Sequence, residues 1–585
     1  MKYDFETIID RTDCGSSKWD SMKQVKPTVN PGVIPLSVAD MEFKMAPEIV
    51  KGLKEYIDTH VLGYTRATDA YINAVIAWQK ERHGLALKKE WLETSSGVVP
   101  ALSSLISILS KPGEGVIIMP PVYYPFSFST ILNDRELVRS PLVNTGETYE
   151  IDFNDFEEKA KDPKNTLLIF CNPHNPVGRV WTKDELQRVS DICITNGVFI
   201  IDDEIHNDLI MPGYTHTPMP SLSDEALNNC AYCTAASKTF NLAGMQASNI
   251  FIADEAKRKR YSLKKMMNMS FSLNTLGYES TRIAYTECKD WLDELLSVID
   301  GNAKYLTSFF KENIPEVKPY RLEGTYLFWA DFRGLGMTHM ELENMMIQDG
   351  DIFLDEGYMF GPLSRGFERF NIACPRKTLE AACTRLLAAV ETVRSRYEKD
   401  GKSFHFLLEE SKPMPDFDYS TQTGKKKSFL AETKGNPTVL IFHRYLSCGF
   451  TQKIIEEITE AYPKIEKAGI QIKLVVQSTP ESASNYTAAP FDIICDHERK
   501  LYTTFNVFPA SSNIELLEGI GTDIIAEMGI DVMSGGGACE GNQLQLPAAV
   551  LIDADGVILH AKYGKTLSDI PTIKELTALL TASSK

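Results

Sequence analysis

The chain has 585 residues, of which 43% are hydrophobic and 24% are charged, and its formal net charge at pH 7 is −18. This length is too great for a single hydrophobic core, and the apolar fraction excludes global disorder. The acidic surface repels phosphate backbones, so we expect no nucleic-acid partner.

The first residues carry acids where a signal peptide would carry an apolar stretch, and no apolar run reaches membrane-spanning length. The eleven cysteines are scattered and form no regularly spaced framework, which is typical of a reducing compartment. We therefore expect a soluble, cytoplasmic protein without membrane contacts, and we assign no metal ligands.

The first candidate site along the chain is the start of a helix. Gly97 precedes a helical stretch at residues 101–109, with Pro100 in the first turn. Exposed backbone amides at such a helix start bind anions. We therefore expect Gly97, Val98 and Val99 to hold a phosphate group.

A strand–helix–strand pattern follows. Residues 166–170 and 198–201 are short apolar runs that predict buried strands. Residues 182–195 between them have helical periodicity, with Thr182 as N-cap and Glu185 three residues later. This order predicts a parallel sheet, and ligands of such sheets bind at the carboxyl ends of the strands.

Polar residues follow both predicted strands directly. In residues 172–179, two Asn-Pro pairs stiffen the loop, which would orient Asn175 as a hydrogen-bond donor. In residues 202–206, Asp203 is the candidate carboxylate, and His206 would lie beside it. Adjacent residues of a strand point to opposite faces, so only one of the neighbouring acids faces a ligand. The rivals of Asp203 are Asp202 and Glu204.

Lys238 lies among small residues, after an apolar run and before a glycine-containing turn. Its combination with the two polar clusters predicts a pyridoxal phosphate (PLP) site. That cofactor needs a lysine amine to hold its aldehyde and a carboxylate to keep its pyridine nitrogen protonated. We assign these roles to Lys238 and Asp203.

The remaining contacts follow from the parts of the cofactor and of an amino-acid substrate. Asn175 would bind the ring oxygen, and Tyr123 would stack on the ring, with Tyr124 as its alternative. His206 would lie near the ring hydroxyl or support Asp203. Arg369, on a predicted strand, would bind the substrate α-carboxylate with two parallel hydrogen bonds.

Residues 1–405 resemble the fold type I PLP-dependent enzymes of the class I/II aminotransferase superfamily, and within it the cystathionine β-lyase (C–S lyase) branch. The motifs that carry the resemblance lie at residues 38–43, 62–65, 203–206, 323–333 and 355–361. The resemblance implies an α/β fold in two parts. The large domain would span about residues 51–290 and contain a mixed, mostly parallel sheet. The N-terminal arm and about residues 291–405 would form a small α/β domain.

The resemblance also implies a homodimer with shared active sites. Tyr64 would reach the cofactor phosphate of the neighbouring subunit, and Ala39 would lie beside the substrate carboxylate. Two departures stand out. Ala235 occupies a position where many relatives carry a hydroxyl residue, which leaves Ser237 and Thr234 as less certain phosphate ligands. Gln246 replaces a phosphate-binding arginine of ordinary aminotransferases, which favours the lyase branch.

The implied reaction is α,β-elimination from cystathionine or a cysteine S-conjugate, which gives a thiol, pyruvate and ammonia. Lys238 would act as the general base at Cα. Two alternatives remain open. One is an amino-acid aminotransferase, which shares the early steps. The other is a thiol-redox protein whose amino-terminal part no longer catalyses a reaction.

After a polar, Pro- and Gly-containing stretch at residues 406–430, which predicts a linker, residues 431–585 resemble a thioredoxin-like domain of the peroxiredoxin/AhpC-TSA type. Cys448 follows a predicted strand and opens a helix, where the helix dipole favours a thiolate. Pro547 occupies the place of a cis-proline facing that cysteine. The pattern departs from the family at Thr451, where a C-x-x-C motif would have its second cysteine.

Two interpretations of this domain remain open: a one-cysteine thiol reductase or peroxidase, and a binding or structural domain without catalysis. The possible resolving partners of Cys448 are Cys495 and Cys539, although no spacing supports either. Cys230 and Cys233 lie in a predicted strand, so we expect them to pack in a core.

Overall fold

The computed structural model describes residues 2–26, 28–400, 408–510, 516 and 540–576. They form two compact units. Unit 1 contains Met1–Asp10, Leu36–Met337 and Leu354–Leu387. Unit 2 contains Arg11–Pro35, Thr338–Phe353 and Ala388–Lys585. Two segments of the predicted amino-terminal enzyme, residues 11–35 and 338–353, therefore cluster with the carboxy-terminal residues.

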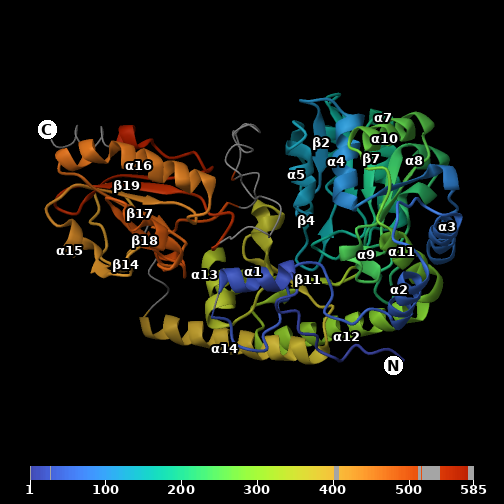
Figure 1. Cartoon of the computed structure of the whole chain (residues 1–585), viewed down its shortest axis with the longest axis horizontal. Helices are drawn as coiled ribbons and strands as arrows, with labels where there is room; N and C mark the ends of the chain where they lie inside the picture. The colour runs from blue at the N-terminus through green and yellow to red at the C-terminus, as the bar shows by residue number, and fades with distance from the viewer. Residues whose placement is uncertain (1, 27, 401–407, 511–515, 517–539, 577–585) are drawn as a thin grey trace. The chain divides into compact units, whose positions relative to one another are not determined.

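Unit 1 is built on a seven-stranded sheet in the order β1-β9-β8-β7-β6-β2-β3 (Figure 1). Its strands are β1 (Leu92–Ser95), β2 (Gly115–Ile118), β3 (Glu136–Arg139), β6 (Asn165–Cys171), β7 (Phe199–Asp203), β8 (Cys230–Thr234) and β9 (Ser248–Ile252). Strands β3, β2, β6, β7 and β8 run parallel, and β9 is antiparallel to both of its neighbours. The predicted mixed, mostly parallel sheet is confirmed.

Two hydrophobic clusters cover the two faces of this sheet. Leu168 and Ile200 pack in one cluster with residues of α7 (Lys183–Asn196), whereas Leu167 and Ile201 pack in the other with residues of α4 (Val98–Leu109). This division follows from the period-two alternation of strand side chains. Helix α7 begins with the predicted capping box of Thr182 and Glu185.

The other helices of unit 1 are α2 (Pro47–Thr59), α3 (Asp69–His83), α5 (Pro125–Ile131), α6 (Phe153–Ala160), α8 (Asp224–Asn228), α9 (Ala236–Thr239), α10 (Glu255–Met267), α11 (Thr275–Glu287) and α12 (Lys289–Asn313). A second, antiparallel sheet has the order β10-β11-β13-β12. Its strands are β10 (Lys318–Pro319), β11 (Leu327–Asp331), β12 (Asp355–Glu356) and β13 (Phe367–Asn371). Helix α14 (Arg376–Asp400) begins in unit 1 and continues into unit 2.

Unit 2 contains a five-stranded sheet in the order β18-β17-β16-β19-β20. Its strands are β16 (Thr438–Phe442), β17 (Gln471–Val476), β18 (Asp492–Cys495), β19 (Ala548–Ile552) and β20 (Ile558–Tyr563). The first three are parallel, and β19 and β20 form an antiparallel hairpin. Its helices include α1 (Ser17–Val25), α13 (His339–Asn344), α15 (Phe429–Thr433), α16 (Gly449–Lys467) and α17 (Lys500–Thr504).

Part of the predicted linker is folded. Strands β14 (Asp418–Ser420) and β15 (Lys426–Ser428) form a hairpin. The hydroxyl of Tyr419 donates a 2.9 Å hydrogen bond to Asp492 at the start of β18, and Tyr419 belongs to the unit 2 core. The sequence of this hairpin resembles a linker because it is rich in polar and turn residues and its few buried side chains are isolated from one another.

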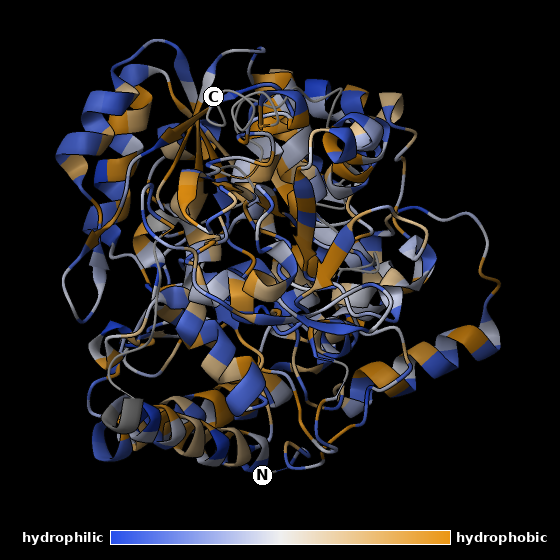
Figure 2. Ribbon diagram, turned by 90° about the vertical axis from the view of Figure 1, so that its left-hand side faces the viewer, coloured by the Kyte–Doolittle hydropathy of each residue, from blue (hydrophilic) through white to orange (hydrophobic). Residues whose placement is uncertain are grey.

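Hydrophobic and hydrophilic residues lie on different sides of individual helices (Figure 2). Within the described part of the chain, no helix combines the length and the apolar character needed to cross a bilayer.

Candidate active site

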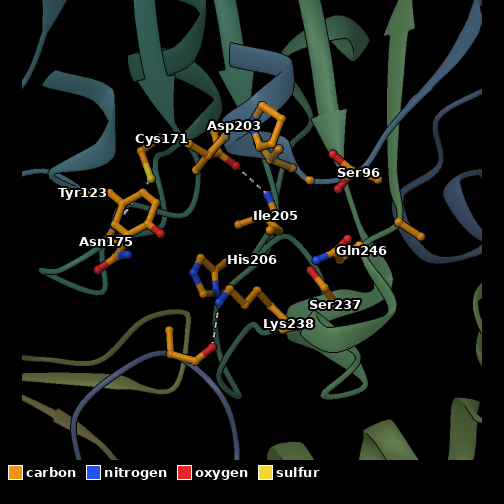
Figure 3. Close-up of a pocket in the computed structure, with 18 residues that line it drawn as sticks. Ser96, Tyr123, Cys171, Asn175, Asp203, Ile205, His206, Ser237, Lys238 and Gln246 are labelled. Carbon is orange, nitrogen blue, oxygen red and sulfur yellow. Dashed lines mark hydrogen bonds between the residues drawn. The ribbon is translucent and has the colours of Figure 1, made fainter. Parts of the chain in front are cut away.

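A cavity of about 180 Å³ lies at the carboxyl ends of the parallel strands of unit 1 (Figure 3). Most of the residues predicted for the cofactor site line it: Ala39, Gly97, Val98, Val99, Tyr123, Asn175, Asp203, His206, Ser237 and Lys238. They come from segments that are far apart in the sequence. The order of the strands brings them together, as expected for ligand sites on parallel sheets.

Lys238 lies in the short helix α9, directly after β8. Its Nζ donates a 2.6 Å hydrogen bond to the backbone carbonyl oxygen of Ala39 (Figure 3). The hydroxyl of Tyr326 donates to the same oxygen at 2.8 Å. The lysine amine is therefore held inside the cavity by a loop 199 residues away in sequence.

Asp203 is the last residue of β7 and is only 4% exposed. Burial raises the pKa of its carboxyl group to about 7, although the amide of Ile205 and the charge of Lys238 act in the opposite direction. The rivals Asp202 and Glu204 do not line the cavity. Glu204 instead accepts hydrogen bonds from the amide groups of Asn172 and Met219, so the alternation of the strand end selects Asp203.

His206, Asn175 and Tyr123 also face the cavity. Burial lowers the pKa of His206 well below its ordinary value, so its imidazole is neutral. Its Nδ1 is buried and has no hydrogen-bond partner among the described residues. Tyr123 lines the cavity, whereas Tyr124 packs against a hydrophobic cluster and Phe360. The structure thus favours Tyr123 over its alternative.

Arg369 lies in β13 and is 2% exposed. It does not line the cavity, but its Nη1 donates a 2.8 Å hydrogen bond to Oδ1 of Asn175, which does. Its Nη2 forms a 2.5 Å ion pair with Asp355. The third nitrogen, Nε, is buried without a hydrogen-bond partner in the described ranges. The sequence did not single out Asp355, and its place next to Arg369 depends on the β12–β13 register.

At the other side of the cavity, the first turn of the twelve-residue helix α4 meets several neutral polar side chains (Figure 3). These are Ser96, Ser237, Gln246 and Ser248. Thr234, the other hydroxyl considered from the sequence, is buried and does not line the cavity. Ser96 and Ser248 were missed: Ser96 directly precedes Gly97, and Ser248 is the first residue of β9.

Tyr64 and Cys448 lie outside the cavity lining. Tyr64 is fully exposed in unit 1, within a segment that also exposes Val61 and Leu62. Cys448 belongs to unit 2. Neither side chain therefore contributes to the cavity lining, and the role predicted for Tyr64 lies in the site of a neighbouring subunit.

Cys448 is the N-cap residue of α16 and is 5% exposed. Nη1 of Arg444 donates a 3.3 Å hydrogen bond to its sulfur. Thr451 is buried and bonds through its hydroxyl to His443 at 2.8 Å. The peptide bond before Pro547 is trans, so the expected cis-proline is wrong for this chain. Cys495 is a free thiol at the end of β18, and Cys539 lies outside the described residues.

The donor set fits pyridoxal phosphate. One amine, from Lys238, projects into the cavity, and a buried carboxyl group, from Asp203, lies opposite. The start of α4 supplies backbone amides for an anion. His206, which lines the cavity, has a buried ring nitrogen that lacks a partner among the described residues and that a polar ligand would satisfy.

The sheet and this site together define the fold type I class of PLP enzymes. The chain belongs to the aminotransferase class I and II family, which matches residues 31–386, and residues 411–561 match the AhpC/TSA family. The predicted buried strand with Cys230 and Cys233 is also confirmed, as β8 of this sheet.

The family match is supported by individual relatives. The chain is 37% identical to the cystathionine β-lyase PatB of Bacillus subtilis over 386 residues, which is 66% of this chain and 99% of that protein. It is similar to the crystal structure of PLP-containing cystalysin from Treponema denticola, with 45% identity, a TM-score of 0.66, and coverage of 67% of this chain and all of the other. A PLP-bound C–S lyase from Staphylococcus hominis gives 30% identity and a TM-score of 0.60, with 67% and 98% coverage.

Proposed function

We propose that the chain is a PLP-dependent carbon–sulfur lyase that acts on cystathionine or cysteine S-conjugates and releases a thiol, pyruvate and ammonia. The observation that carries this proposal is the 37% identity across nearly all of a cystathionine β-lyase. Gln246 stands where ordinary aminotransferases carry a phosphate-binding arginine, and the other polar side chains at that side of the cavity are also neutral. This difference also favours the lyase branch.

When bound, pyridoxal phosphate supplies an electron-withdrawing ring that makes the α-proton of an amino acid acidic. Arg369 binds the α-carboxylate, with Asn175 and Asp355 fixing its guanidinium plane. Asp203 would bind the ring nitrogen, and its carboxylate would stabilise a proton there. The amides at the start of α4 would hold the phosphate.

Lys238 is the general base in this mechanism. Its amine takes the proton from Cα, while the carbonyl oxygen of Ala39 accepts one of its N–H groups and fixes the direction of the lone pair. The resulting ammonium group then returns a proton to the departing sulfur. The electron pair left at Cα forms a Cα=Cβ double bond as the C–S bond breaks, and the thiol leaves with that proton. The three-carbon enamine that remains reacts with water to give pyruvate and ammonia.

The decisive test is an assay of pyruvate with cystathionine and with S-methylcysteine, in the absence of any 2-oxo acid. Pyruvate formation supports the lyase. Turnover that requires a 2-oxo-acid acceptor would instead identify an aminotransferase, and the elimination proposal would be wrong.

We also propose that the active form is a homodimer. Unit 1 exposes large apolar side chains in two segments of the sequence: Ile57, Val61, Leu62 and Tyr64 in one, and Leu263, Met266, Met267, Met269 and Phe271 in the other. Apolar side chains that gather on a surface mark interaction sites. In a second copy, Tyr64 would reach the cofactor phosphate of its neighbour, which gives its full exposure a purpose.

For the carboxy-terminal unit we propose a thiol-redox role for Cys448. The hydrogen bond from Arg444 to its sulfur favours this role, because a guanidinium stabilises a thiolate. We place the lyase in residues 1–405 and the thioredoxin-like domain in residues 431–585, and we expect the protein in the cytoplasm. Loss of peroxide or disulfide reduction in Cys448→Ser would support the redox role, and an inactive parent protein would contradict it.

A further inference from the structure

One buried carboxylate connects the carboxylate-binding arginine to the loop that holds the catalytic lysine. Oδ2 of Asp355 accepts a 2.5 Å hydrogen bond from Nη2 of Arg369 and a 2.9 Å hydrogen bond from the backbone nitrogen of Val38. The side chains of Asp355 and Arg369 are 10% and 3% exposed. The two contacts share one acceptor oxygen, and water screens them little because both side chains are buried.

The backbone at Val38 is strained. Its φ of +50° lies in the left-handed region, which a β-branched residue rarely adopts. Such a conformation persists only where the surroundings fix it from several sides. Here Asp355 holds the nitrogen of Val38, and Nδ2 of Asn371 donates a 2.7 Å hydrogen bond to its carbonyl oxygen.

The next residue shows what this strained loop positions. The carbonyl oxygen of Ala39 accepts the hydrogen bonds from Lys238 and Tyr326 at 2.6 and 2.8 Å. If Val38 relaxed to an ordinary conformation, the chain that follows it, Ala39 included, would change direction, and this oxygen would move away from the lysine. The hydrogen bonds that hold Val38 in this conformation therefore keep the acceptor of the Lys238 amine in place.

We propose that Asp355 is a positioning residue that couples carboxylate binding at Arg369 to the placement of the Lys238 amine. The proposal rests on the assignment of these two residues in the proposed lyase. It assigns Asp355 two separable effects: one on Arg369, through the ion pair, and one on Lys238, through Val38 and Ala39.

The two effects are separated by steady-state kinetics of the PLP-loaded enzyme. We expect Asp355→Ala to raise KM about tenfold, because Arg369 loses its partner, and to lower kcat about tenfold, because Ala39 no longer holds Lys238. Glycine adopts the left-handed region without strain, so adding Val38→Gly to Asp355→Ala restores kcat but not KM. Asp355→Asn keeps an acceptor oxygen and loses less of kcat than Asp355→Ala.

A second readout does not depend on turnover. In the cofactor-free protein, acetic anhydride acetylates Lys238 at a rate that mass spectrometry can follow, with exposed Lys51 as the internal reference. We expect Asp355→Ala to speed acetylation of Lys238 about threefold relative to Lys51, and Val38→Gly to reverse the change.

The matched control is Asp331→Asn. Asp331 pairs with Arg333 at 2.7 Å in the same unit and does not line the cavity. This variant should change neither readout. The coupling would be overturned if Asp355→Ala changed neither kcat nor the acetylation rate of Lys238. It would also be overturned if adding Val38→Gly restored neither kcat nor the acetylation rate. If the parent protein showed no elimination, the lyase proposal would fail, while the acetylation rates would still test Asp355.

Discussion

The ε-amino group of Lys238 is held at 2.6 Å by the backbone carbonyl oxygen of Ala39, a residue of the loop that follows the N-terminal arm. A neutral carbonyl oxygen accepts a hydrogen bond from the amine without favouring its charged form, so the amine can still react. A carboxylate partner would instead favour a permanently protonated amine. This contact therefore suits a lysine that must alternate between holding a cofactor and moving a proton.

Lys238 should be the point of cofactor attachment. Borohydride reduction of the PLP-loaded protein should leave a cofactor mass on the peptide that contains Lys238, and Lys238→Ala should lose both this adduct and the characteristic visible absorbance. Lys265→Ala, which removes an ion pair with Glu93 away from the cavity, is the control and should keep both signals. An adduct that persists in Lys238→Ala would refute the assignment.

Asp203 should make the stability of the cofactor-free protein depend on pH. Its folded-state pKa, about 7, lies above its ordinary value of 3.8. The contribution to stability is therefore fully present below pH 3.8 and is lost as the pH rises through 7. The free energy of unfolding of the parent, relative to Asp203→Asn, should fall by roughly 2–4 kcal/mol across this range.

This comparison is made by denaturant titration at several pH values. The nearby acids Asp202 and Glu204, whose pKa values burial also raises, are present in both proteins, so the difference between the proteins isolates Asp203. A difference that stays constant from pH 4 to pH 8 would contradict the shifted pKa.

Arg369→Lys should weaken substrate binding more than it alters chemistry. Lysine keeps the positive charge opposite Asp355 but cannot form two parallel hydrogen bonds with a carboxylate. We expect KM for an amino-acid substrate to rise about 10- to 100-fold, with kcat falling less. Thermal denaturation serves as the control, because a large fall in Tm would show that the variant damages the fold.

The shared active site should be detectable by complementation. Lys238→Ala and Tyr64→Ala should each be inactive as homodimers. A hybrid dimer purified through two different affinity tags contains one site with both native residues, and it should recover about half of the parent activity. No recovery in a hybrid that sediments as a dimer would show that Tyr64 acts within its own subunit or not at all.

The hydrogen bond from Arg444 should control the reactivity of Cys448. We expect Arg444→Gln to slow alkylation of Cys448 by iodoacetamide at pH 7 about tenfold, because the sulfur loses the guanidinium that donates a hydrogen bond to it. Exposed Cys14 is an internal reference in the same digest. Equal rates in both proteins would remove the main support for a redox role.

Much of the fold could be predicted from local patterns. The runs at residues 166–170 and 198–201 are apolar on both faces and became β6 and β7 of the central sheet. The capping box at Thr182 fixed the start of α7. The hairpin β14–β15 was missed, because its turn residues and charges resemble a linker and its stability comes from contacts with β18.

The sequence by itself determined the chemistry that this protein carries: a lysine after one strand, acids and a stiff asparagine loop after two others, and an arginine on a distant strand. Each of these patterns lies within a short stretch of sequence, and the backbone geometry of that stretch alone produces it. Only the tertiary structure decided which neighbouring acid faces the cavity, which tyrosine lines it, and that Asp355 joins Arg369 to the Val38 loop. Those choices depend on strand register and on contacts between residues hundreds of positions apart, which no local pattern contains.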